Sequence, residues 1–464
     1  MTDKRAVELI VAGGVVVTVD RERRVLADGA VAIEAGRIVA VGPTAEVEAT
    51  CRPARWIDAG GHIVMPGLVD AHVHITAETL TRGLALDDAG HRWMWDYALP
   101  LYAAITEDEE FVGASVACLE MLRNGTTTFA EGGTARAIGA SARAVEASGQ
   151  RAVLSPWTWD LMRDLDGLRF DTDTALKRNA DAIAAHHGGA GGRLAVATSC
   201  VTPGLCSPEL LTGLKALADA HRTTFTFHHA SSVEPVDAYV AKHGRRPLLD
   251  YAELGILGRN TRTTHMVHLD DDEMAALVAS GASVAHCPQT AFRLAYGAAR
   301  HGRFPEMLAQ GVAVGLGTDG VNSSDNQDLF KAMQIAAGLF KDSRQAPELM
   351  PAETVVEMAT ITGARALGMA DEIGSLEAGK RADLILIDRR VPELTPLIDV
   401  ANALVYATDG RNVKTVIVGG RELMRDGEVL TLDAERLMDE VERRAPELIA
   451  RAGLTPRPRW PLRR

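Results

Sequence analysis

The pattern of apolar and polar positions divides the chain into two β-rich ends and a middle of a different kind. Short apolar runs separated by turns with glycine and aspartate fill residues 7–66, and the same pattern returns near the other end, which is typical of a small β-sandwich. We therefore expect 1–66 and 371–464 to form one composite sandwich, with an amphipathic helix over Asp433–Arg451 on the outside. The predicted strands are Glu8–Val11, Gly14–Val19, Ala30–Ile33, Arg37–Val41, Ala382–Ile387 and Val413–Val418.

The middle of the chain, 67–370, alternates short apolar strands with amphipathic helices. Eight strands with helices between them are typical of a parallel (β/α)₈ barrel, although periodicity alone also allows a doubly wound open sheet. The predicted strands are Ile63–Val69, Thr126–Phe129, Ala152–Ser155, Leu194–Thr198, Thr224–His228, Thr261–His265, Ser283–His286 and Val312–Gly315. The predicted helices are Glu107–Arg123, Ala175–His187, Pro208–His221, Asp271–Ser280, Phe304–Gln310 and Ala352–Gly363.

Polar residues at the ends of four predicted strands favour the barrel. His72 and His74 close the first strand, and the period of two puts both imidazoles on one face, as half of a cation site. Three further strands end in His228, His265 and Asp319. Because the carboxyl ends of all strands of a parallel barrel meet at one mouth, these groups can converge although they lie far apart in the sequence.

Composition and charge exclude several classes of partner. The chain has 464 residues and a formal net charge of −13, so no basic surplus is available for nucleic acid or an acidic membrane. No stretch approaches the ~18–20 apolar residues of a membrane span, and the first residues lack the form of a signal peptide. The five cysteines are scattered without CxxC spacing, which is typical of buried thiols in a reducing compartment. We expect a cytoplasmic protein that acts on a small molecule.

With these features the chain resembles the amidohydrolase superfamily, in its branch of aminohydrolases and triazine chlorohydrolases, over nearly its whole length. The resemblance implies that His72, His74, His228 and Asp319 bind one divalent metal ion, and that His265 lies beside it to polarise the substrate. It also implies a homo-oligomer, because barrels of this family commonly assemble. The motifs that carry it are Pro66–His74, Asn124–Thr128, His228, His265, Gly317–Asp319 and Ile373–Leu384.

The expected chemistry is hydrolysis. A bound cation lowers the pKa of water from about 15.7 towards ~7, and Asp319 can accept the water proton and pass it to the leaving group. Zn²⁺ or Co²⁺ is favoured, while Mn²⁺ and Fe²⁺ also suit three histidines and one aspartate. A second metal usually needs a lysine or carboxylate at the fourth strand, and Leu194–Cys200 offers neither, so we expect one ion.

One position departs from the deaminases of this branch. They carry His-x-x-Glu on the fifth strand, where the glutamate protonates the ring nitrogen of the substrate. Here the run is His228-His229-Ala230-Ser231, and a hydroxyl cannot deliver a proton near neutral pH. Glu234, three residues further on, is an alternative donor if it folds back. The substitution favours a substrate whose electrophile is an ordinary carbonyl.

The same segment gives a narrower resemblance, to bacterial hydrolases of thiocarbamate (molinate-type) and phenylurea herbicides. We therefore expect hydroxide formed at the metal to attack the carbonyl carbon of a small neutral carbamate, thiocarbamate or phenylurea-like xenobiotic, releasing a thiol, alcohol or amine. The alternative is an aminohydrolase or chlorohydrolase acting on a triazine, purine or pyrimidine ring, and a third is a non-catalytic binding protein on a retained barrel. The expected substrate contacts are Trp93, Trp157, Ser231 and Ser323.

Overall fold

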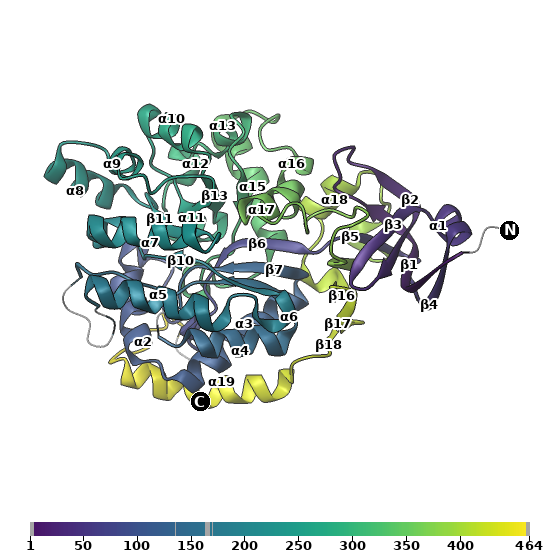
Figure 1. Cartoon of the computed structure of the whole chain (residues 1–464), viewed down its shortest axis with the longest axis horizontal. Coiled ribbons are helices and arrows are strands. Elements are labelled where there is room, and N and C mark those ends of the chain that lie inside the picture. Colours follow the sequence, from purple (N-terminus) through teal and green to yellow (C-terminus); the bar gives the residue numbers. More distant parts are fainter. Residues whose placement is uncertain (1–3, 135, 163–167, 169, 461–464) are drawn as a thin grey trace.

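The structure is a computed structural model, and it describes residues 4–134, 136–162, 168 and 170–460. A barrel of strands wrapped in helices stands beside a smaller β-rich unit that contains strands from both ends of the chain (Figure 1). This confirms the predicted fold class, a (β/α)₈ barrel with a composite β-unit from both termini. The exact domain boundaries stay a prediction.

The composite unit is one nine-stranded sheet in which both ends of the chain interleave. Its order is β18-β17-β16-β15-β5-β1-β2-β3, with β4 paired to β1. The junction between the two ends is the antiparallel pair β15 and β5, where Leu386 faces Val64. The strands are β1 (Arg5–Val17), β2 (Val25–Glu34), β3 (Arg37–Pro43), β4 (Cys51–Asp58), β5 (His62–Pro66), β15 (Leu384–Asp388), β16 (Val413–Val418), β17 (Arg421–Arg425) and β18 (Glu428–Val429).

Strand β1 differs from the prediction of two separate strands over Glu8–Val11 and Gly14–Val19. It runs unbroken for 13 residues, because the glycine pair makes a bulge and not a turn. Gly13 has a φ of +84°, and the register with β2 shifts between Ala12 and Gly14. A bulge inserts an extra residue without ending the strand.

The barrel consists of two parallel sheets, β6-β7-β8-β9 and β10-β11-β12-β13-β14. Only Ala197 separates β9 from β10, and a parallel bridge between Val73 and Asp319 joins the end of β6 to the segment after β14. Eight barrel strands are therefore present, the number that the sequence predicts. They are β6 (Leu68–Val73), β7 (Thr126–Glu131), β8 (Arg151–Leu154), β9 (Leu194–Val196) with β10 (Thr198–Ser199), β11 (Phe225–His229), β12 (Thr261–His265), β13 (Ser283–His286) and β14 (Val314–Leu316).

The prediction of one strand over Ile63–Val69 is wrong, because the chain passes from one sheet to the other at Gly67. Residues before it belong to β5 and those after it to β6. A Cβ atom at Gly67 would lie 2.1 Å from Thr127 Oγ1, so only glycine fits this crossing. Its N–H donates to the carbonyl oxygen of Asp383, 3.1 Å away in the opposite unit.

Helices cover the outside of the barrel (Figure 1). The expected helix over Ala352–Gly363 is two helices, because Thr360 has non-helical backbone angles (φ −135°, ψ −102°). The longer helices are α3 (Glu107–Arg123), α4 (Ile138–Ser148), α5 (Thr172–His186), α7 (Pro208–Ala220), α8 (Val233–His243), α10 (Asp271–Ser280), α15 (Leu329–Arg344) and α19 (Ala434–Arg451). The shorter ones are α1 (Thr44–Thr50), α2 (Leu99–Ala104), α6 (Gly189–Gly192), α9 (Pro247–Glu253), α11 (Pro288–Arg293), α12 (Ala298–His301), α13 (Phe304–Ala309), α14 (Val321–Ser324), α16 (Ala352–Met358), α17 (Ile361–Ala366) and α18 (Val400–Tyr406).

The last helix, α19, lies along the barrel beneath α2 and α3 (Figure 1). The side chain of Leu448, in this helix, is fully buried in a cluster with Leu80, Leu84 and Leu101. Leu80 belongs to η1 (Ala77–Thr81), the 3₁₀ turn that follows β6. The C-terminal helix therefore supports the segment directly after the first barrel strand.

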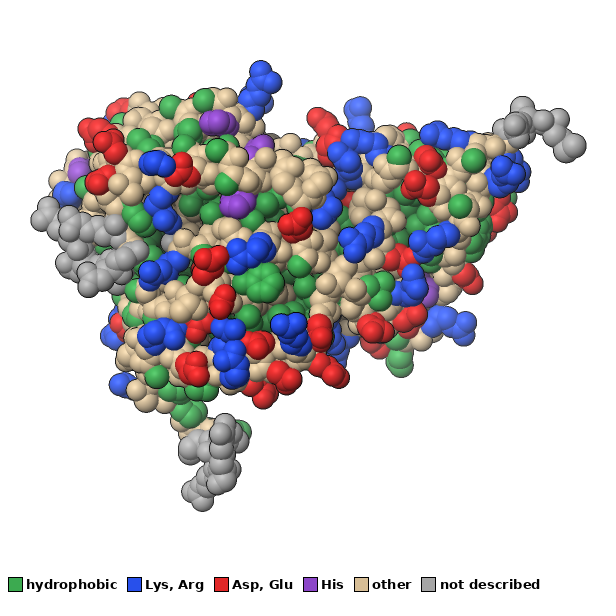
Figure 2. Space-filling model, turned by 60° about the horizontal axis from the view of Figure 1, so that its bottom comes forward, with side chains coloured by type: hydrophobic (Ala, Val, Ile, Leu, Met, Phe, Trp, Pro, Cys, Tyr) green, Lys and Arg blue, Asp and Glu red, His purple; other side chains and the backbone are tan. Residues whose placement is uncertain are grey.

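The surface carries both signs of charge. Figure 2 shows acidic and basic side chains interspersed over the visible face. Within the described part of the chain, no helix has the length and apolar character needed to cross a bilayer.

Candidate metal centre

Three imidazole nitrogens and one carboxylate oxygen converge at the mouth of the barrel. Nε2 of His228 lies 3.2 Å from Nε2 of His72 and 3.3 Å from Nε2 of His74. Oδ1 of Asp319 lies 3.6 Å from Nε2 of each of those two residues. The groups come from β6, β11 and the loop after β14, so the barrel brings together the four ligands that the resemblance implies.

These separations fit a cation. Four ligands bonded at about 2.0–2.2 Å in tetrahedral geometry lie about 3.3–3.6 Å from one another. The ligating atoms of the three histidines all lie within 4.8 Å of one another, as do those of His72, Cys287 and Asp319. Cys287 is a buried neighbour whose thiol pKa is raised well above its usual value, mainly by burial. The site suits a single divalent ion.

The outer atoms of the histidines hold the rings so that Nε2 faces the centre. His228 Nδ1 donates to the carbonyl oxygen of Val201 at 2.8 Å, and His72 Nδ1 lies 3.1 Å from Thr264 Oγ1. His74 Nδ1 lies 4.0 Å from the carboxyl group of Glu131. The bonds of His228 and His72 select the tautomer that leaves Nε2 free to bind a metal, while His74 Nδ1 has no hydrogen-bond partner in the described part of the chain.

The protonation states at the site also favour a cation. Burial lowers the pKa of His72 and of His265 to about 3, and lowers the pKa of His74 and His228 as well. Burial alone would raise the pKa of Asp319, but the close imidazoles outweigh it and hold that pKa well below its usual value. Neutral imidazoles and an ionised carboxylate are the forms that bind a metal, since ligands must be deprotonated.

The backbone is strained where the barrel strands end at this site. His265 and Asp319 have φ values of +75° and +62°, a region that side-chain-bearing residues rarely adopt. Such strain is typical of sites that position functional groups. Gly132 packs flat against two ligands, because a Cβ atom there would lie 2.4 Å from His72 Cε1 and 2.7 Å from His74 Cε1.

Aromatic side chains wall the centre on two sides. The Trp157 ring lies 5.6 Å from the ring of His74 and 6.2 Å from that of His228. Opposite, the Tyr296 ring lies 5.7 Å from His265, and Trp93 Nε1 donates to the Tyr296 hydroxyl at 3.0 Å. His265 itself lies beside the ligands, with Nε2 3.9 Å from Asp319 Oδ2.

Two expected substrate contacts have different environments. Ser231 is half-buried just after β11, and its hydroxyl has no hydrogen-bond partner in the described part of the chain. The hydroxyl of Ser323 is fully buried and donates to the carbonyl oxygen of Gly320 at 2.7 Å, so it holds a turn together. Glu234 does not fold back: it is exposed in the first turn of α8, whereas His72, His74 and Asp319 are buried and His228 is half-buried.

Several residues around the centre are not suggested by the sequence. Glu78 and Tyr102 are buried beyond the end of β6 and bonded to each other, while Thr264 bonds His72 and Glu131 lies behind His74. A charged residue in a buried strand is a sequence signal that could have identified Glu131. Glu78 lies in a short turn without periodicity, and no sequence signal identifies it.

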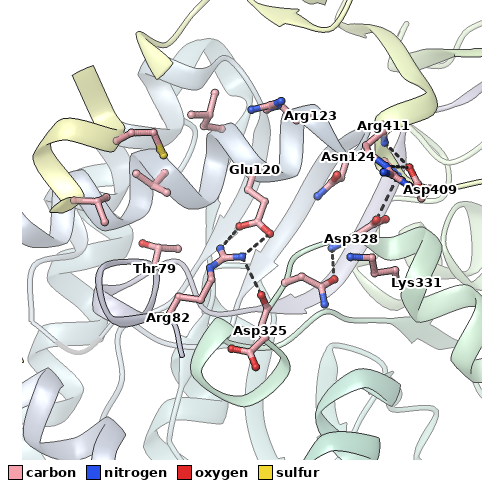
Figure 3. Close-up of a pocket in the computed structure, with 16 residues that line it drawn as sticks. Thr79, Arg82, Glu120, Arg123, Asn124, Asp325, Asp328, Lys331, Asp409 and Arg411 are labelled. Carbon is pink, nitrogen blue, oxygen red and sulfur yellow. Dashed lines mark hydrogen bonds and ion pairs between the residues drawn. The ribbon is translucent and has the colours of Figure 1, made fainter. Parts of the chain in front are cut away.

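A separate cavity of about 720 Å³ lies on the outside of the barrel, between α3, α19 and the segments after β6 and β14. Figure 3 shows Arg82 at its wall, pointing to the carboxylate of Glu120 and the backbone of Asp325. None of the candidate metal ligands lines it. It borders the back of η1, whose Thr79 also faces it.

The comparisons with known proteins agree over most of the chain. The profile described as the amidohydrolase family matches residues 63–423. The chain belongs to the amidohydrolase family. It is accordingly a metal-dependent hydrolase of that superfamily. A short profile, the imidazolonepropionase-like composite domain of bacteria, matches residues 29–50.

Relatives that match nearly the whole chain indicate which reactions similar proteins carry out. This amidohydrolase is 37% identical to a 5-methylthioadenosine/S-adenosylhomocysteine deaminase of Syntrophobacter fumaroxidans, over 94% of the chain and 97% of the relative. It is 36% identical to a 5'-deoxyadenosine deaminase of Methanosarcina mazei, over 96% of the chain and 99% of the relative. Its structure is similar to that of an adenosine deaminase from Xanthomonas campestris with bound zinc, with a TM-score of 0.90 and 29% identity over 97% of this chain and 100% of that one.

These relatives correct the expected reaction. The prediction of carbamate, thiocarbamate or phenylurea hydrolysis is wrong, because these relatives of nearly equal length act on nucleosides by name. The narrower resemblance to herbicide hydrolases finds no support in them, and neither does Co²⁺ as a favoured ion, whereas the bound zinc of the adenosine deaminase supports one divalent ion with Zn²⁺ favoured. That prediction rested on Ser231, which stands where the deaminases of this branch carry glutamate on the fifth strand. The findings instead support the alternative, an aminohydrolase acting on a purine ring.

Proposed function

We propose that this amidohydrolase deaminates the adenine ring of a purine nucleoside modified or unmodified at its 5' position, with one divalent ion, Zn²⁺ by preference. The observation that carries the proposal is the convergence of His228 Nε2 and Asp319 Oδ1 on the Nε2 atoms of His72 and His74, at 3.2–3.6 Å, in a chain that matches nucleoside deaminases over nearly its whole length. His72, His74, His228 and Asp319 would hold the ion. When bound, the ion supplies Lewis-acid activation of the attacking water.

The chain's own residues divide the remaining work. Asp319, ionised, accepts the proton of the attacking water and passes it to the amino group that leaves as ammonia. His265 stays neutral because its pKa lies near 3, and it donates a hydrogen bond to the oxygen atom that bonds to C6. His72, His74, His265 and Asp319 are buried and His228 is half-buried, so little bulk water reaches the set, which strengthens these interactions.

The aromatic walls fit a planar base. Trp157 Nε1 and Trp159 Nε1 are buried and have no hydrogen-bond partner in the described part of the chain. Unpaired buried donors are rare in proteins unless a ligand or water completes them. Beside the metal ligands, the Trp157 N–H is suited to bind an acceptor nitrogen of a purine, and Trp93 and Ser231 remain proposed contacts. The homo-oligomer and the cytoplasmic location stay predictions.

The proposed reaction is tested with zinc-loaded protein and 5'-methylthioadenosine, S-adenosylhomocysteine, 5'-deoxyadenosine and adenosine. We expect at least one to yield ammonia and the hypoxanthine nucleoside, measured by ultraviolet absorbance and ammonia release. Chelation should abolish turnover and Zn²⁺ restore it. Asp319→Asn should lower kcat by about 10³-fold or more, because it removes both a ligand and the proton acceptor. Asp181→Asn, on the exposed face of α5, is the matched control and should keep full activity. Zinc-loaded protein that releases no ammonia from any of the four would contradict the proposal.

A further inference from the structure

The proposed deamination lacks a proton donor for the ring nitrogen on the fifth strand, where Ser231 stands. Three buried carboxyl groups other than Asp319 lie near the metal centre: Asp70, Glu78 and Glu131. Their positions along the barrel axis decide which of them can reach a substrate.

Two of the three are engaged within the barrel wall. Asp70 lies inside β6 and accepts hydrogen bonds from the backbone of His72 and from both the backbone and the hydroxyl of Thr318. Glu131 closes β7 behind His74 and accepts from Thr134 Oγ1 at 3.2 Å. Both carboxyl groups hold the framework of the ligands.

Glu78 lies in a different place, beyond the end of β6. It is four residues past His74, in η1, and its side chain is fully buried. Oε2 accepts from the backbone N–H of Asn322 at 3.0 Å, three residues past Asp319, and a Cβ atom at Gly320 would collide with the Glu78 carboxyl group. The carboxyl group is therefore on the side of the barrel mouth from which a substrate approaches the ion.

The other carboxyl oxygen connects to the aromatic wall. The hydroxyl of Tyr102 donates to Glu78 Oε1, and the Tyr102 ring packs 5.1 Å from that of Trp157, which in turn packs on His74. A carboxyl group has about four acceptor positions. The hydrogen bonds from Tyr102 and Asn322 occupy two of these positions, which leaves the others for the carboxyl proton and its bond to one ring nitrogen.

The turn that carries Glu78 is anchored from its far side. Thr79 Oγ1 donates to the carbonyl oxygen of Gly113 at 2.8 Å. Arg82 binds Glu120 on α3 and the carbonyl oxygen of Asp325 at 2.9 Å (Figure 3). Because contacts on both faces hold η1, the Glu78 carboxyl group is fixed in place, as a proton donor must be.

We propose that Glu78, held by Tyr102, is the proton donor to the ring nitrogen in this enzyme and replaces the glutamate that is missing at Ser231. The inference rests on the proposed deamination. As the water oxygen bonds to C6, the Glu78 carboxyl group gives its proton to N1 and Asp319 takes the first water proton. The C6–N bond then breaks, the amine leaves as ammonia with the proton from Asp319, and the second proton of the added oxygen returns to Glu78 as the C6=O bond forms.

The electrostatics of Glu78 agree with this role. Burial raises its pKa to about 7, and the negative charge of Asp319 adds to the shift, while the bonds from Tyr102 and Asn322 oppose it. Tyr296 also faces this carboxyl group and stays neutral, since burial raises its pKa above the usual value. Glu78 is therefore partly protonated near neutral pH, and activity that needs this proton should fall as the pH rises through this pKa.

The test compares Glu78→Gln with the wild-type enzyme on the best nucleoside substrate. We expect kcat to fall by about 10²–10⁴-fold with KM changed less than about threefold, zinc content and melting temperature retained, and the alkaline limb of the pH profile lost. Adding Ser231→Glu to Glu78→Gln should recover at least about tenfold in kcat, because it restores a carboxyl group at the fifth-strand position. Glu234→Gln, an exposed carboxyl group nearby, is the control and should behave as wild type.

Different results would overturn the role of Glu78 and the proposed deamination. A wild-type enzyme that deaminates, with Glu78→Gln within threefold of its kcat or with the same alkaline limb, overturns the role of Glu78 alone. A fall in kcat that Ser231→Glu does not rescue also overturns it. A wild-type enzyme that deaminates nothing overturns both. If Glu78→Gln does not fold, Tyr102→Phe replaces it: loss of a hydrogen bond to the carboxylate should raise the Glu78 pKa and move the alkaline limb to higher pH, and an unmoved limb overturns the role.

Discussion

At the scale of single residues, the site is built by side chains whose second polar atom is fixed. His228 turns Nε2 inward because Val201 binds its Nδ1, and His72 does so beside Thr264. Trp157 differs from them, because its ring packs on two ligands while its N–H has no partner in the described part of the chain. An unused donor at this position indicates a contact to be made by the substrate.

Trp157→Phe tests that contact, since it removes the N–H and keeps an aromatic ring. We expect KM for the nucleoside to rise by about three- to tenfold, which corresponds to a hydrogen bond of about 0.5–1.5 kcal/mol, with kcat changed less than threefold. Steady-state kinetics measure both. Trp56→Phe, on the exposed strand β4, is the control. An unchanged KM would show that the indole N–H does not bind the substrate.

The residues of the site differ in how far the sequence reveals them. His72, His74, His228 and Asp319 could be predicted, because each closes an apolar strand and parallel strands end at one mouth. Glu78 could not, because its role depends on contacts with Tyr102 and Asn322 that are 24 and 244 residues away. The substrate prediction was wrong for the same reason, because the sequence shows Ser231 at the fifth-strand position but does not show that the carboxyl group of Glu78 lies near the site.

At the scale of elements, η1 is the piece on which the proposed chemistry depends. It is held by α3 and the loop after β14 on one side, and by α19 through the buried cluster of Leu80, Leu84 and Leu448 on another. The amphipathic pattern of α19 was predictable over Asp433–Arg451, with Asp433 as its cap. Its docking on the barrel was not, because an apolar stripe does not identify the surface that it covers.

Leu448→Ala tests whether α19 stabilises η1. Loss of a fully buried leucine costs about 2–5 kcal/mol where the site cannot collapse, so we expect a lower melting temperature and faster amide hydrogen exchange in residues 77–84. Activity should fall more steeply with temperature than in the wild type. Leu430→Ala, at an exposed leucine just before the helix, serves as the comparison and should show neither effect. Unchanged exchange in residues 77–84 would place the support of η1 elsewhere.

At the scale of the whole molecule, the barrel and the nine-stranded sheet are joined by polar contacts as well as by the crossing at Gly67. The guanidinium of Arg151 on β8 binds the carboxylate of Asp383 through Nε at 3.1 Å and a second nitrogen at 3.3 Å. Asp383 precedes β15 and also accepts from the backbone of Gly419 at 2.7 Å. Both side chains are less than one-tenth exposed.

Asp383→Asn should therefore destabilise the protein by breaking this connection while keeping the shape of the side chain. Removing one partner of a buried ion pair leaves the other charge uncompensated, at a cost of about 3–5 kcal/mol, so we expect the melting temperature to fall by about 5 °C or more. The matched control is Asp181→Asn, which removes an exposed pair with Lys177 and should change stability by less than about 0.5 kcal/mol. Because Asp383 lies on the side of the barrel that faces the composite sheet, zinc binding and kcat at low temperature should persist. A variant that loses zinc in parallel with its melting temperature would mean that the barrel depends on the composite sheet to form its metal site.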